Sequence, residues 1–279
     1  MKIMTQRNPH ISRRTVFRTI AGTALASLAG CLSDGSGTSD NGADPLDSQD
    51  LFEHVAVEGT ELVVELSAEA EVDQINLIKP NGELFGQREV ATGSQQVSFE
   101  LRTTYTPGEY RVIGLNREER VADIPTEIRP EIQIQDVGLF RNNPDKPWDD
   151  IYGDTETDRL KNGEVFVTVA NTGTGPEAIV KLVFSGDVPN PIENPQQNGI
   201  YKTERVVLSP GEETDLFSNS FPFGSASETG MGCSPDTNHG QFTVTIDTRV
   251  GNSEVANSYS VEYTGSHEMS DCVITIAEA

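Results

Sequence analysis

From residue 51 onward, hydrophobic and polar residues alternate in short runs. Valine, leucine, isoleucine or phenylalanine occupies every second position at 97–101, 165–169, 242–246 and 274–276. A period of two places these apolar side chains on one face of a β-strand. Turn sequences such as Pro80-Asn81-Gly82, Asn162-Gly163 and Pro210-Gly211 separate the runs. The pattern predicts an all-β chain of antiparallel sandwiches.

The alternation is interrupted between residues 123 and 130, where Pro125 and Pro130 stand close together. We expect about five strands before this break and about seven after it. The chain is therefore predicted to form a small N-terminal β-sandwich over 51–124 and a larger immunoglobulin-like sandwich over 131–279. A single continuous sandwich made from both halves is the alternative.

The first 31 residues have a different character. A twin-arginine pair, Arg13 and Arg14, precedes an apolar run from 19 to 29, and Leu28-Ala29-Gly30-Cys31 has the pattern of a lipobox. The run is too short to cross a bilayer as a helix, which needs about 20 residues. We therefore expect residues 1–30 to be a twin-arginine signal peptide that is removed, leaving Cys31 to carry a lipid on the extracellular face of the cell membrane. The alternative is an uncleaved N-terminus with a chance cysteine.

Composition indicates the environment of the exported chain. Residues 31–50 are rich in Gly, Ser and Asp, and we expect this segment, which begins at the lipidated Cys31, to be a flexible acidic stalk. After removal of the five basic residues of the signal, 44 acidic and 15 basic residues remain, a net charge of −29. Such charge is well screened only in concentrated salt, which predicts a halophilic, archaeal cell surface. It argues against nucleic acid as a partner.

Two turn motifs in the second half resemble those of a known family. Asn171-Thr172-Gly173-Thr174-Gly175 follows a predicted strand, and Leu208-Ser209-Pro210-Gly211-Glu212 comes later. This pairing resembles CARDB-type immunoglobulin-like domains of prokaryotic surface proteins, although the insert between the motifs is longer than usual. Tyr105-Thr106-Pro107-Gly108-Glu109-Tyr110 is similar to the turn before a late strand in immunoglobulin-like folds. The N-terminus resembles haloarchaeal twin-arginine lipoproteins. The resemblance to CARDB-type domains implies binding, adhesion or spacing, with no catalytic residues to transfer.

Two cysteines remain besides Cys31. The predicted hairpin of 241–248 and 255–263 brings Cys233 and Cys272 to one end of the sandwich, and an oxidising compartment favours a disulfide between them. An alternative uses the same place: His239 and His267, with the two cysteines as thiolates, offer four ligands for zinc or copper.

Two further candidate sites lie between residues 140 and 164. The acidic stretch 145–164 fails the spacing of a calcium loop, which leaves a looser calcium site or a solvated loop as alternatives. Trp148, with Phe140 and Tyr152, is a candidate exposed aromatic platform for a ligand, and a packed core is the alternative.

No catalytic motif is present in the sequence, so we do not expect an enzyme, and no cofactor is expected. The predicted function is a binding or structural, adhesion-like role at the cell surface. Expected partners are the membrane, through the lipid on Cys31, and a surface-layer protein, another envelope protein or a polysaccharide. A metal-handling lipoprotein and an extracellular hydrolase with an unrecognised acidic pair are the alternatives.

Overall fold

The computed structural model describes residues 51–153, 162–191, 197–224, 231–266 and 271–279. The predicted signal peptide and stalk lie outside these residues. Within the described ranges, no helix is both long enough and apolar enough to cross a membrane. The sheets are antiparallel throughout, which confirms the all-β prediction.

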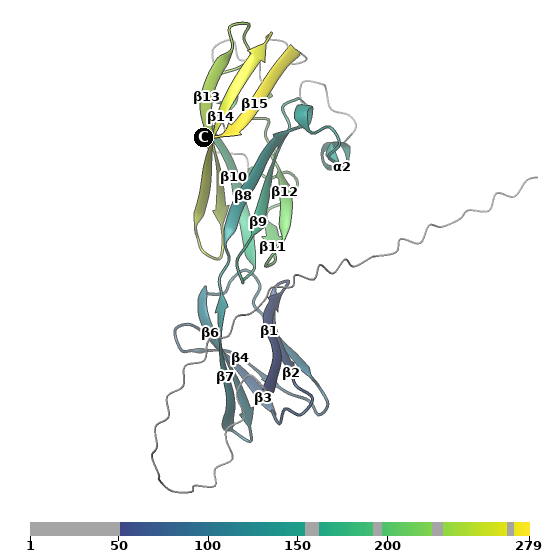
Figure 1. Cartoon of the computed structure of the whole chain (residues 1–279), viewed down its shortest axis with the longest axis vertical. Helices are drawn as coiled ribbons and strands as arrows, with labels where there is room; N and C mark the ends of the chain where they lie inside the picture. Colours follow the sequence, from purple (N-terminus) through teal and green to yellow (C-terminus); the bar gives the residue numbers. More distant parts are fainter. Residues whose placement is uncertain (1–50, 154–161, 192–196, 225–230, 267–270) are drawn as a thin grey trace, which may run out of the picture. The chain divides into compact units, whose positions relative to one another are not determined.

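The first group of strands, which we name the first module, consists of a three-stranded and a four-stranded sheet in the orders β1-β2-β5 and β4-β3-β6-β7 (Figure 1). Its inward side chains form one hydrophobic cluster that includes Leu62, Ile75, Phe99 and Tyr110, all of them fully buried. The strands are β1 (Phe52–Glu58), β2 (Glu61–Leu66), β3 (Gln74–Ile78), β4 (Leu84–Glu89), β5 (Gln96–Glu100), β6 (Gly108–Asn116) and β7 (Glu119–Ile128).

The second group of strands, the second module, has a five-stranded sheet in the order β11-β10-β13-β14-β15 and a three-stranded sheet in the order β12-β9-β8. A separate hydrophobic cluster lies between its sheets, built from alternate residues such as Val167, Val244 and Tyr263. Its strands are β8 (Ile132–Leu139), β9 (Val165–Asn171), β10 (Glu177–Gly186), β11 (Val206–Leu208), β12 (Glu213–Phe217), β13 (Asn238–Thr248), β14 (Glu254–Gly265) and β15 (Cys272–Glu278). A 3₁₀ turn, η1 (Phe140–Asn142), and one short helix, α2 (Trp148–Tyr152), follow β8.

The break between the two groups is shorter than the prolines predicted. β7 continues through Pro125, which lies opposite Arg111 of β6, and ends at Ile128. β7 pairs with β6 alone, so it is an edge strand of its sheet. Proline lacks a backbone N–H, and an edge strand tolerates that loss because one side of the strand has no neighbour to bond. Only residues 129–131 separate β7 from β8.

The two turn motifs of the second module meet at Asn171. This side chain is fully buried, and its Nδ2 donates hydrogen bonds to the carbonyl oxygens of Gly175 (2.8 Å) and Leu208 (3.2 Å). Its Oδ1 accepts from the backbone N–H of Glu131 (3.2 Å). The backbone carbonyl of Asn171 accepts from the N–H of Gly211 (2.8 Å), which has a φ of +73°. One buried amide therefore holds both turns and the chain entering β8.

The turn after Asn171 also reaches the first module. The Tyr105 hydroxyl donates to the carbonyl of Pro176 (3.2 Å), and a Cβ at Gly175 would collide with that hydroxyl. The turn after β13 packs Val250 against the first module's cluster. Buried Glu177 holds this turn by accepting from the N–H groups of Arg249 (3.2 Å) and Val250 (2.8 Å). The motifs that carry the family resemblance thus serve as a structural joint.

Candidate functional site

The disulfide prediction is confirmed. Cys233 and Cys272 are bonded, with their Cα atoms 5.4 Å apart. Cys233 precedes β13 and Cys272 begins β15, and both strands flank β14 in the sheet. The antiparallel pairing of β13 with β14 and of β14 with β15 brings the starts of β13 and β15 to one end. The hairpin predicted from the sequence therefore identified the pairing of the two cysteines correctly.

The structure does not support the metal-site alternative at that end. The two sulfur atoms are joined to each other, which removes both thiolates from the ligand set. His239 is exposed, with 70% of its side chain accessible, and its Nδ1 lies 3.6 Å from Glu262. His267 lies outside the described residues. Across the described ranges, no group of three or more His, Cys, Asp or Glu side chains is arranged to hold a metal ion.

The expectation of an exposed aromatic platform is wrong. Trp148 is 2% exposed and Tyr152 is 7% exposed, while Phe140 is half-buried. Trp148 and Tyr152 form a small hydrophobic cluster with Phe166 of β9, and Phe217 of β12 packs against it. Phe166 and Phe217 alternate with the inward residues of their strands, so they lie on the outer side of the sheet β12-β9-β8. Trp148 and Tyr152 therefore pack over this sheet and are not exposed to a ligand.

Polar groups fix this aromatic cluster in place. The indole N–H of Trp148 donates to the carbonyl of Asn143 (2.7 Å), and the Tyr152 hydroxyl donates to the carbonyl of Ser218 (2.6 Å). The Nζ of Lys146 lies 4.0 Å from the centre of the Phe166 ring and 2.5 Å from Oδ2 of Asp215. These bonds satisfy the polar atoms that the cluster buries. The calcium alternative stays untested, because residues 154–161 of the acidic stretch are not described.

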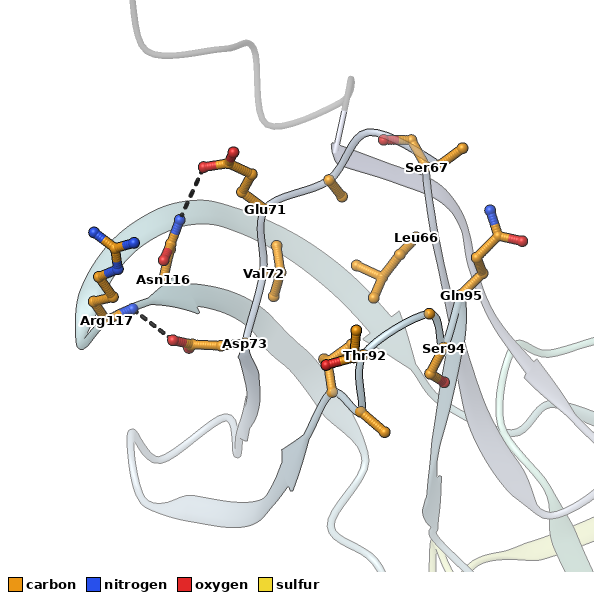
Figure 2. A pocket seen from close by; sticks show the side chains of 15 residues that line it. Leu66, Ser67, Glu71, Val72, Asp73, Thr92, Ser94, Gln95, Asn116 and Arg117 are labelled. Carbon is orange, nitrogen blue, oxygen red and sulfur yellow. Dashed lines mark hydrogen bonds between the residues drawn. The ribbon is translucent and has the colours of Figure 1, made fainter.

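The structure also contains a depression that the sequence did not indicate. It lies at one end of the first module and has a volume of about 460 Å³. The loops 67–73 and 90–95 and the turn at 116–117 line it, with buried Leu66 and Val72 among its lining residues. Figure 2 shows the polar side chains around it, including Ser67, Thr92 and Gln95. No sequence signal marks it, because three loops that are distant in the chain contribute to it.

Both carboxylates in this depression accept hydrogen bonds from neutral groups. Asp73 Oδ2 accepts from the backbone N–H of Arg117 (2.7 Å), and Glu71 accepts from the side-chain amide of Asn116 (3.5 Å) (Figure 2). Glu71 and Asp73 are both exposed to solvent. Exposed carboxylates gain little from binding a ligand, because water competes for them.

Comparisons with known proteins assign no family to the chain. No family model matches the chain, and no curated protein matches it. Similar solved structures include a family 2 glycosyl hydrolase from Bacteroides cellulosilyticus (15% identity, TM-score 0.21, 72% of this chain and 24% of that one). They also include the ligand-binding domain of human OSCAR (12% identity, TM-score 0.22, 81% of this chain and 93% of that one). A two-domain fibronectin type III segment of chicken tenascin is a further match (11% identity, TM-score 0.25, 82% of this chain and 96% of that one).

The chain spans about a quarter or less of the glycosyl hydrolases it matches. TM-scores this low carry no argument about activity. The architecture consists of paired antiparallel sheets around separate cores, the arrangement of immunoglobulin-like and fibronectin-like sandwiches. The chain is therefore an all-β protein of antiparallel sandwiches.

Proposed function

We propose that this protein is a lipid-anchored extracellular protein that displays two immunoglobulin-like modules in a binding or structural role. The twin-arginine pair Arg13 and Arg14 directs export, and Cys31 carries the anchor. The stalk over 31–50 separates the modules from the lipid headgroups. Surface loops of the second module contact a surface-layer protein, another envelope protein or a polysaccharide.

The disulfide between Cys233 and Cys272 is the observation that carries this proposal. Structural disulfides form and persist in oxidising compartments and are rare in the cytosol. An export signal and a disulfide are independent features of the chain, and they agree. The excess of 44 acidic over 20 basic residues fits the same location, because it keeps an exposed protein soluble in concentrated salt.

Fractionation of the native cells tests the anchor. We expect the wild-type protein in the membrane fraction, with an intact mass that starts at a lipidated Cys31. The Cys31→Ala variant loses the attachment atom, so we expect it in the medium with an unchanged circular dichroism spectrum. A serine substitution at the exposed Asn252 is the matched control and should stay in the membrane. Membrane retention of Cys31→Ala would disprove the anchor.

A further inference from the structure

The middle of the outer face of the five-stranded sheet carries no charged side chain among the residues that the structure describes. In β13 and β14, the side chains that alternate with buried Phe242, Val244, Tyr259 and Val261 point away from the core. The pairing of β10, β13, β14 and β15 is regular between residues 181 and 278, so these outward side chains form ordered rows. We name the central part of this surface the hydroxyl face. It lies between the row of Asp247 and the row of His239 and Glu262, and consists of Ser185, Gln241, Thr243, Thr245, Ala256, Ser258, Ser260 and Ala277.

The hydroxyl face carries no formal charge, although the chain contains 44 acidic and 20 basic residues. Charged residues mark both of its ends. Lys181 and Asp247, 3.8 Å apart, lie at one end, and the pair of His239 and Glu262 lies at the other. Five of its eight side chains carry a hydroxyl, one is an amide and two are alanine methyl groups. Solubility does not require an uncharged face in such an acidic protein, so solubility does not explain why this face lacks charge.

The side chains of this face are accessible and held in place. Ser258 and Ala277 are exposed, and Thr243 and Ser260 are half-buried by their neighbours. The Thr243 and Ser258 hydroxyls lie 3.1 Å apart across β13 and β14, and the Ser260 hydroxyl donates to the carbonyl of Ala277 (3.2 Å). Fixed hydroxyls lose little conformational freedom when a ligand binds them.

Part of the adjacent sheet edge is already occupied, which disfavours the addition of a partner strand there. β15 is the edge strand, and strand addition needs its free backbone groups. Arg141 donates to the carbonyl of Cys272, and Asn142 donates to the carbonyl of Ile274 (3.1 Å). These side chains of η1 occupy the backbone acceptors that an added strand would pair with.

Size and charge identify the kind of partner. Four strands about 4.8 Å apart, with about five residues each, cover roughly 300 Å². A stable protein interface buries about 800 Å² on each partner, so this face is too small for one. A second copy would also bring together two chains with a formal net charge of −24 each. A neutral polyhydroxylated chain avoids that repulsion, exchanges hydrogen bonds with the rows of hydroxyls and gains avidity from many displayed copies.

We infer that the hydroxyl face is a docking site for a neutral polysaccharide. This inference rests on the proposed function, because it names the partner class of the displayed module. It adds a sheet face to the surface loops as a contact surface of this module.

Affinity electrophoresis of the full mature protein tests the inference. Native gels contain dextran, galactomannan or hydroxyethyl cellulose as neutral probes, and alginate as an anionic one. We expect at least one neutral polysaccharide to slow the wild-type protein, and alginate to have no effect. Ser258→Glu places a charge in the centre of the face and should weaken the apparent affinity at least tenfold. Gln135→Glu adds the same charge on exposed β8 and should bind like wild type.

A double variant, Thr243→Ala with Ser258→Ala, removes two hydroxyls without adding charge, and we expect it to weaken binding about threefold to tenfold. The inference is overturned if no neutral polysaccharide slows the protein, or if Ser258→Glu and Gln135→Glu behave alike. It is also overturned if sedimentation shows a dimer that Ser258→Glu dissociates, since the occupant is then a second copy. Each of these outcomes is independent of the Cys31 experiment, so the anchor and the docking face can fail separately.

Discussion

The two outer sheet faces of the second module differ in what covers them. On the sheet β12-β9-β8, the outward residues Phe166 and Phe217 are aromatic, and the segment containing Trp148 packs over them. On the five-stranded sheet, the outward residues in the middle of β13 and β14 include Thr243, Thr245, Ser258 and Ser260, and no comparable aromatic cluster covers them among the described residues. Both sheets bury their inner faces in the same core. One outer face therefore contributes to stability. The other outer face is left available for contact with a partner.

The largest expected difference between the two faces is in stability. Trp148→Ala removes a side chain that is 2% exposed, together with the hydrogen bond to Asn143. We expect it to lower the free energy of unfolding by about 3–5 kcal/mol, measured by chemical denaturation. The matched substitution Thr245→Ala on the hydroxyl face should change it by less than about 0.5 kcal/mol. Similar losses for both variants would show that the two faces contribute equally.

The disulfide has a nearly equal expected effect and concerns the uncovered sheet. It joins Cys233 to the first residue of β15 and closes a sequence separation of 39 residues. The chain-entropy model gives a loss of about 4 kcal/mol when the bond is reduced. Denaturation of the wild-type protein with and without reductant measures this loss. The double variant Cys233→Ser with Cys272→Ser should equal the reduced protein and show no response to reductant; a response would mean that reductant acts elsewhere.

The smallest expected effect compares hydroxyls on the two sides of β14. The Tyr263 side chain points into the core, and its hydroxyl donates to the carbonyl of Asp187 (2.8 Å). Tyr263→Phe leaves that buried carbonyl without this bond and should cost about 1 kcal/mol. Ser258→Ala, on the outer side of the same strand, should leave the free energy of unfolding within about 0.5 kcal/mol of wild type.

Alkaline pH sharpens this last comparison. Burial, and next the nearby charge of Asp187, raise the pKa of Tyr263 well above its ordinary value. The folded state therefore favours the protonated phenol. Its stabilising effect is complete below the unfolded pKa of about 10 and is lost as pH rises above that value. We expect the free energy of unfolding to fall above about pH 10, less steeply in Tyr263→Phe; an identical slope would assign the loss to other groups.

Local patterns in the sequence were enough to predict the fold class and the disulfide. Alternating apolar residues at 165–169, 242–246 and 274–276 identified parts of β9, β13 and β15. The pairing of Cys233 with Cys272 followed from the order of two strands and one turn. Strand number was underestimated: β1 to β7 and β8 to β15 make seven and eight strands within the described residues, against about five and about seven expected. Strands with irregular alternation, such as β1 and β4, give little periodic signal.

The candidate sites were less predictable. The pattern around Trp148 could not distinguish an exposed platform from a packed cluster, because its cover comes from Phe166 and Phe217, distant in sequence. The depression near Glu71 and the hydroxyl face were not predicted, since each combines residues from several loops or strands. The CARDB-like motifs were identified in the sequence, but their mutual bonding through Asn171 was not.

The sequence by itself determined the properties that depend on neighbouring residues or on composition. Strands follow from a period of two, turns from Gly and Pro, and net charge from counting. The predicted export signal and lipid site rest on the same kind of local pattern. Only the tertiary structure decided which outward face is covered, which edge is partly occupied by Arg141 and Asn142, and which hydroxyls lie in rows. These properties depend on strand register and sheet order, which pair residues far apart in the chain.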